Sequence, residues 1–258
     1  MGIAAKPHQV FSYAEQLGLN WQQDLALLTT HRQSGYSRIE QANYSVLFDH
    51  ANVGPDYLPG HAHADTLSFE MSVGKERLFV NSGTSLYGVS KERLRQRKTA
   101  AHNTVVVADA DSSEVWSGFR VARRAYAKLI AASTSDNRAV ITASHDGYTR
   151  LKPKINHKRT LVSEPDNLVI TDDLSAAVKA DFHLHFHPNV VVVEMLANEI
   201  VLQLPAGQRV KFSSSAVINV VDSTWHPQFG VSINNKKIII PFTSTRLETA
   251  IHLVKDLC

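Results

Sequence analysis

The sequence is poor in cysteine, because its 258 residues contain only Cys258. A single thiol cannot close an intrachain disulfide, and a cluster of thiolate metal ligands is also excluded. Long hydrophobic runs are lacking too, since no segment approaches the ~20 apolar residues of a membrane-spanning helix. The first nine residues carry no apolar run of signal-peptide length. We therefore expect no membrane span, and the compartment stays undefined.

The chain also lacks a strong excess of charge of one sign. Its net charge is +3, with 43% apolar and 20% charged residues, which is typical of a folded globular protein. The basic excess is concentrated at residues 91–98 and 120–124. A basic surface favours acidic partners such as uronate-bearing or sulfated glycans, nucleic acid or anionic lipid. We expect no nucleic-acid partner, because no nucleic-acid-binding motif accompanies these charges.

Short apolar segments separated by turn signals fill the chain after His31. Many short strands with polar turns between them are typical of an antiparallel β-sandwich. The apolar spacing from Gln9 to Thr30 instead predicts one or two short helices, and a further helix is expected from Ser90 to Lys98, with Ser90 as N-cap. The predicted fold is all-β, with a large antiparallel β-sandwich over residues 34–258 and a helical leader over residues 1–33.

Two histidines and an aspartate alternate along the segment that begins at Pro59 and Gly60. On a β-strand, His61, His63 and Asp65 would share one face. Burying such groups without partners costs roughly 1–3 kcal/mol each, so a metal, a substrate or another polar group is expected to satisfy them. The cluster can hold a metal ion, position an acid or base, or form hydrogen bonds within the fold.

Histidine recurs in two later segments. His183, His185 and His187 alternate with apolar residues, and we favour a structural strand over a metal-binding face for them. His157 and Arg159 are two residues apart, so they can share a strand face and bind an anion, or form a satisfied polar pair inside the fold.

Familiar metal-binding and phosphate-binding motifs do not fit. A metallo-β-lactamase site requires a histidine where Thr66 stands, and a cupin site requires a glutamate closer to His63 than Glu70. The sequence also lacks the zinc-protease His-Glu-x-x-His motif and the Gly-x-x-x-x-Gly-Lys phosphate loop.

One longer set of motifs fits a known family. The runs Gly60 to Glu70, Val80 to Thr84, Thr99 to Val107 and Ser112 to Trp116 together resemble the C-terminal domain of the heparinase II/III-like polysaccharide lyases. The resemblance covers about Ser34 to Phe186 by motif. It implies a β-sandwich that packs against an N-terminal α/α toroid, with acidic polysaccharide such as glycosaminoglycan bound between them. It also implies cleavage by β-elimination and a periplasmic or secreted setting.

The resemblance also implies roles for individual residues. His61 matches the histidine that the sandwich contributes to the cleft. Separately from the resemblance, Tyr87 is a candidate for proton transfer, since a tyrosine can act as a general acid or base. His63 and His102 match zinc ligands, but Asn81 stands where an aspartate ligand is expected. An amide is a poorer zinc ligand than a carboxylate, so we expect weak or no zinc binding. Three arginines are candidates for binding glycan carboxylates or sulfates: Arg93, Arg95 and Arg97.

About thirty residues precede the predicted sandwich, too few for a toroid. We therefore expect the β-sandwich portion of a polysaccharide lyase that acts on acidic, uronate-containing polysaccharide and is incomplete without an α/α toroid domain or chain. The alternative is a non-catalytic module that binds glycan or packs against another domain.

Overall fold

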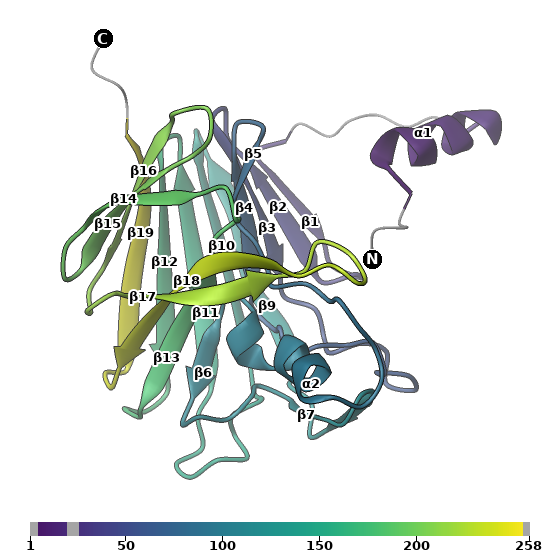
Figure 1. Cartoon of the computed structure of the whole chain (residues 1–258), viewed down its shortest axis with the longest axis vertical. Coiled ribbons are helices and arrows are strands. Elements are labelled where there is room, and N and C mark those ends of the chain that lie inside the picture. The colour runs from purple at the N-terminus through teal and green to yellow at the C-terminus, as the bar shows by residue number, and fades with distance from the viewer. Residues whose placement is uncertain (1–4, 20–25, 255–258) are drawn as a thin grey trace.

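The computed structural model describes residues 5–19 and 26–254, and its regular structure is mainly antiparallel β-sheet, as predicted (Figure 1). The largest sheet has eight strands. Its order is β14 (Val191–Met195), β15 (Glu199–Gln203), β16 (Arg209–Ser214), β19 (Arg246–Val254), β12 (Asn167–Leu174), β11 (His157–Glu164), β10 (Arg138–His145) and β9 (Ala127–Ser135).

Two smaller sheets are joined to each other by backbone pairing. The first contains β1 (Leu28–His31), β2 (Tyr36–Glu40), β3 (Tyr44–Asp49), β4 (Phe69–Val73) and β5 (Glu76–Phe79) in that order. The second has the order β17 (Asn219–Trp225), β18 (Ile233–Phe242), β13 (Ala180–His185) and β6 (Val105–Val107). An isolated bridge joins the two sheets, between Phe79 of the edge strand β5 and Phe186, which directly follows β13.

The core lies between these two joined sheets and the eight-stranded sheet. Burial alternates along β10, β11, β12 and β19, so every second side chain faces the core. Phe79 links the layers, because its ring lies 6.0 Å from Phe186 and 6.4 Å from Phe212 of the eight-stranded sheet. One buried cluster contains residues from all three sheets.

The remaining elements lie around one end of the sandwich. They are α2 (Lys91–Arg97), the 3-10 helix η1 (Thr99–Ala101) and the hairpin of β7 (Glu114–Trp116) and β8 (Arg120–Ala122). α2 and β7 lie side by side (Figure 1). Ser90 is the N-cap of α2 as predicted, since its Oγ accepts a hydrogen bond from Arg93 N at 3.0 Å.

The helical prediction for the leader is only partly correct. Helix α1 spans Pro7–Gln16, but Leu28–His31 forms strand β1 and pairs with β2. The threonines of this segment favour a strand, and the hydrogen bonds to β2 outweigh the apolar spacing. Residues 20–25 lie outside the described residues, and the domain division at residue 33 stays a prediction. No helix in the described ranges is long and apolar enough to cross a membrane.

The face of β13 that carries His183 and His185 is buried rather than exposed. η1 covers it, because His185 Nε2 lies 3.0 Å from the carbonyl oxygen of Ala100. His183 Nδ1 lies 3.3 Å from Lys237 Nζ. These histidines form hydrogen bonds within the fold, in agreement with a structural interpretation.

Candidate functional site

The segment that carries His61, His63 and Asp65 is a loop and not a strand, so the alternation argument for these residues is wrong. β4 begins only at Phe69. Backbone turns form the loop, and Leu67 within it is buried with a φ of 64°. The three side chains nevertheless line one pocket of ≈ 1020 Å³.

His61 and Tyr87 form a pair beside this pocket. His61 is exposed, and its Nδ1 lies 3.2 Å from the Tyr87 hydroxyl. The two rings meet edge to face with centroids 5.1 Å apart, and the Phe119 ring lies 6.0 Å from His61. The structure thus brings the predicted cleft histidine, His61, within hydrogen-bond distance of Tyr87, the candidate for proton transfer.

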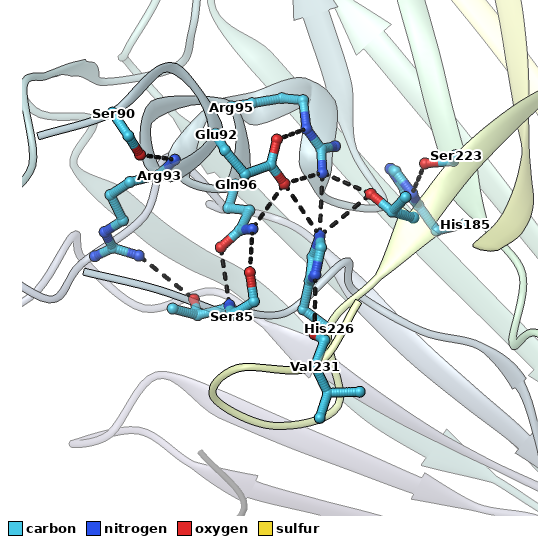
Figure 2. A network of polar contacts seen from close by, with 12 residues as sticks. Ser85, Ser90, Glu92, Arg93, Arg95, Gln96, His185, Ser223, His226 and Val231 are labelled. Carbon is cyan, nitrogen blue, oxygen red and sulfur yellow. Dashed lines mark hydrogen bonds and ion pairs between the residues drawn. The ribbon is translucent and has the colours of Figure 1, made fainter. Parts of the chain in front are cut away.

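Arg93 packs against the Tyr87 ring, and its side chain leaves α2 on the side opposite that of Arg95 (Figure 2). Its side chain is fully buried, and its Cζ lies 5.1 Å from the centroid of the Tyr87 ring and 6.0 Å from that of Phe119. Nε donates a hydrogen bond to the carbonyl of Gly118, whereas buried Nη2 has no hydrogen-bond partner among the described residues. Burial lowers the pKa of Arg93.

A hydrogen-bonded chain leads from Arg93 to the two histidines that match zinc ligands. Arg93 Nη1 lies 3.1 Å from His63 Nε2, and His63 Nδ1 lies 3.3 Å from His102 Nε2. Because a guanidinium only donates, His63 accepts at Nε2 and carries its proton on Nδ1, which donates to His102. Burial, followed by the charge of neighbouring groups, holds the pKa of His63 well below its usual value, and burial lowers that of His102 to about 3. Both imidazoles are neutral at pH 7.

Of the residues predicted for a structural zinc site, His63 and His102 lie together, whereas Asn81 offers an amide, a poorer zinc ligand than a carboxylate. Such sites bind four ligands, mainly thiolates, imidazoles and carboxylates. Here the imidazoles of His63 and His102 bond to each other, and Asn81 Oδ1 accepts a hydrogen bond from Asn103 N at 3.2 Å. We derive no chemical step through zinc, and its binding stays a prediction.

Arg95 is part of a network with the loop between β17 and β18 (Figure 2). Its guanidinium donates to both carboxylate oxygens of Glu92 and to Thr224 Oγ1 at 2.6 Å. His226 Nε2 lies 3.1 Å from Arg95 Nη2 and 3.4 Å from Glu92 Oε1. Hydrogen bonding to Arg95, opposed by burial, lowers the pKa of Glu92 to about 2. Arg95 thus holds this loop against α2, and the charge of Arg95 is paired with that of Glu92.

Arg97 is fully buried and anchors the loop that carries His61. Its Nε and Nη2 donate to the carbonyl oxygen of Ala62 at 3.1 and 3.0 Å, and Nη1 donates to that of Arg120. The guanidinium is bound inside the fold, where it positions this loop, and substrate binding by Arg97 stays a prediction.

Two carboxyl groups face the pocket from its floor. Asp49 and Asp65 both line it, and Tyr36, which also lines it, is the cross-strand partner of Asp49. Burial raises the pKa of Asp65 to about 6, and burial together with the charge of Asp65 raises that of Asp49 well above its usual value. The pocket is therefore lined by two carboxyl groups that keep their protons to a higher pH than an exposed carboxyl does.

Sequence reasoning missed a buried network and two aromatic residues. The anion bound by His157 and Arg159 is Asp172, which lies 2.6 Å from His157 Nε2 and 2.8 Å from Arg159 Nε. Alternation placed His157 and Arg159 on one face, but nothing local identified the carboxylate of β12. Phe119 and Phe229 flank Tyr87, with ring centroids 5.7 and 5.3 Å from it. Neither was singled out as a site residue, because nothing in the neighbouring sequence shows that its turn packs against Tyr87.

Comparisons with known proteins agree with this fold. The heparan sulfate lyase HepC from Pedobacter heparinus has 13% sequence identity and a TM-score of 0.77, over 97% of this chain and 42% of that one. A heparinase III gene product has 15% identity and a TM-score of 0.74, over 96% and 39% of the two chains. Another heparinase III structure has 15% identity and a TM-score of 0.71, over 91% and 38%. A search of curated proteins found no match.

These likenesses concern the fold, and this chain spans only 38–42% of the length of the three structures. The sequence itself gives the stronger assignment. The family described as "Heparinase II/III-like, C-terminal" matches residues 24–253, which include both small sheets, the eight-stranded sheet and the His61 loop. The chain therefore belongs to the heparinase II/III-like C-terminal family.

Proposed function

We propose that this chain is the sandwich portion of a polysaccharide lyase that cleaves acidic, uronate-containing polysaccharide by β-elimination. The observation that carries the proposal is the His61–Tyr87 pair, with Nδ1 and Oη 3.2 Å apart beside a large pocket. An imidazole and a phenol in contact can accept a proton at one atom and deliver one from the other.

The reaction needs two proton transfers on a uronate ring. A base removes the proton from C5, the electron pair forms the C4–C5 double bond, and the C4–O4 bond breaks as an acid protonates the leaving oxygen. We assign these transfers to Tyr87 and His61. Negative charge develops on the uronate carboxylate between these events, and the buried guanidinium of Arg93 beneath Tyr87 stabilises it electrostatically.

A second, helical domain or chain is part of the proposal. The matched lyase structures are more than twice as long as this chain, and the family resemblance implies an α/α toroid that completes the cleft. Acidic polysaccharide is the proposed substrate. We also propose a periplasmic or secreted setting, on the resemblance alone.

The test is to incubate heparan, chondroitin, hyaluronan and alginate with this chain, alone and together with a helical-domain partner. Ultraviolet absorbance then detects any unsaturated uronate product. We expect product from the combination and its loss in His61→Ala. His252→Ala is the control, because His252 is an exposed histidine on β19. Unchanged activity in His61→Ala would refute the catalytic assignment.

The second candidate is a non-catalytic glycan-binding or domain-packing module. It is favoured because this chain matches only 42% of the length of the HepC structure, so more than half of that lyase has no counterpart in this chain. Binding of acidic glycan without product, in the presence of every helical partner tested, would establish it.

A further inference from the structure

Three aromatic side chains form a continuous surface next to His61. Tyr87 lies between Phe119 and Phe229, with ring centroids 5.7 and 5.3 Å away, and we call these three residues the aromatic wall. Phe119 is 43% exposed and Phe229 is 52% exposed. Exposed phenyl rings grouped in this way are costly in water, so they indicate a surface that binds something.

The wall is held rigidly by its surroundings. The Phe229 loop is fixed because His226 N donates to Ser82 O and Gly230 N donates to Ser85 O, both at 2.7 Å. It approaches Gly83 so closely that a Cβ there would lie 2.1 Å from the carbonyl oxygen of His226.

The turn that carries Phe119 is equally close to the Tyr87 segment. A Cβ at Gly118 would lie 2.4 Å from the carbonyl oxygen of Gly88. Three separate segments, those of Tyr87, Phe119 and Phe229, therefore present their rings in one fixed arrangement. A preformed surface of this kind loses little conformational freedom when it binds.

The charges behind the wall are positive and lack carboxylate partners. Arg93 and Arg97 are both fully buried, and neither forms an ion pair among the described residues. Arg93 lies over the rings of Tyr87 and Phe119, and its Nη2 makes no hydrogen bond there. The charge of Arg93 lies directly against two rings of the aromatic wall, and a buried cation without a counter-charge attracts an anion to such a surface.

We infer that Phe119 and Phe229, with Tyr87 between them, form a subsite for an acidic sugar unit of the polysaccharide. The C–H face of a pyranose ring packs on the phenyl rings, and its carboxylate or sulfate lies in the positive potential of Arg93 and Arg97. The inference rests on the proposed function for the identity of the ligand. It adds Phe119 and Phe229 as binding residues, and it requires that the bound sugar unit carry a negative charge.

The test is calorimetric binding of heparan sulfate, hyaluronan and alginate hexasaccharides to the chain, with cellohexaose as the neutral probe. We expect at least one acidic hexasaccharide to bind, more weakly at high salt, and cellohexaose not to bind. Phe119→Ala and Phe229→Ala should each raise the dissociation constant roughly three- to tenfold. Met195→Ala should not change it, because Met195 is 51% exposed on the edge strand β14. Phe229→Leu, which keeps an apolar side chain in the loop, should also weaken binding.

These outcomes separate the subsite from the lyase activity. If Phe119→Ala and Phe229→Ala bind as tightly as the parent chain, or if no acidic hexasaccharide binds, the subsite is wrong, whether or not product forms. If both variants weaken binding in a His61→Ala background, the subsite is supported. The subsite stays supported even if no product forms with any helical partner. Such a lack of product would count against the proposed lyase activity only.

Discussion

Arg159 and Asp172 form a fully buried ion pair in which the guanidinium binds both carboxylate oxygens, at 2.8 and 3.0 Å. Arg159 Nη1 also donates to the carbonyl oxygens of Leu67 and Asn103, at 2.6 and 2.7 Å. The pair therefore connects the eight-stranded sheet to the ends of the two segments that carry His63 and His102. The charge of Arg159, against the opposing effect of burial, holds the pKa of Asp172 at about 2.

Asp172→Asn should destabilise the chain by about 3–5 kcal/mol, because it leaves the guanidinium of Arg159 buried without a counter-charge. Denaturant unfolding measures this loss. Asp173→Asn is the matched control, since the neighbouring Asp173 pairs with exposed Lys158 and Arg246. Surface ion pairs contribute little, so the control should unfold almost as the parent does. Equal losses in both variants would contradict the importance of the buried pair.

Asp65 should make the chain less stable as the pH rises from about 4 to about 6. Its pKa in the folded state, about 6, exceeds the model-compound value of 3.8, so the native state binds more protons than the unfolded chain in this window. The loss is on the order of 2 kcal/mol. Asp65→Asn should remove this part of the pH dependence in denaturant melts from pH 4 to 7, whereas Asp56→Asn, at an exposed residue of the same pocket, should retain it. If the free energy of unfolding changed with pH equally in the parent and in Asp65→Asn, the raised pKa of Asp65 would be refuted.

Zinc binding should respond to one substitution. We expect the purified chain to contain far less than one zinc per molecule, and Asn81→Asp to raise that content, because a carboxylate replaces the amide at the third predicted ligand. Elemental analysis and melting with and without chelator measure this. One zinc per molecule in the parent chain, with a lower melting temperature after chelation, would show that Asn81 suffices as a ligand.

Arg95→Gln should loosen the loop that carries Phe229. The substitution removes the hydrogen bonds from α2 to Thr224 and His226, so amide exchange at residues 226–231 should accelerate. Hydrogen exchange followed by mass spectrometry reports this directly. Lys236→Gln, which removes an exposed ion pair with Asp222 from the same two strands, is the control. Equal exchange in Arg95→Gln and the parent would exclude this role for Arg95.

The sandwich could be predicted because its strands repeat a pattern that depends only on neighbouring residues. Alternating burial along β10 to β12 is visible in the sequence, as are the turns between them. The Leu28–His31 strand was missed because its apolar spacing also fits a helix, and only pairing with β2 decides between them.

The candidate site was predictable only where family motifs mark it. The loop at His61 was expected to be a strand, but Arg97 and Arg159 hold its carbonyls in a conformation that no local pattern shows. The resemblance identified His61, His63 and His102. It gave no indication that Phe229 would reach Tyr87, because that contact depends on how the β17–β18 loop packs.

The backbone pairing at Phe79 and Phe186 links the unfolding of the two small sheets. The two small sheets share backbone hydrogen bonds there, since Val80 N donates to His185 O at 3.0 Å and His187 N donates to Leu78 O at 2.9 Å. Phe79 also packs against the opposite layer through Phe212. Neither small sheet can therefore detach without exposing the core of the other, and we expect all three sheets to melt in a single cooperative transition.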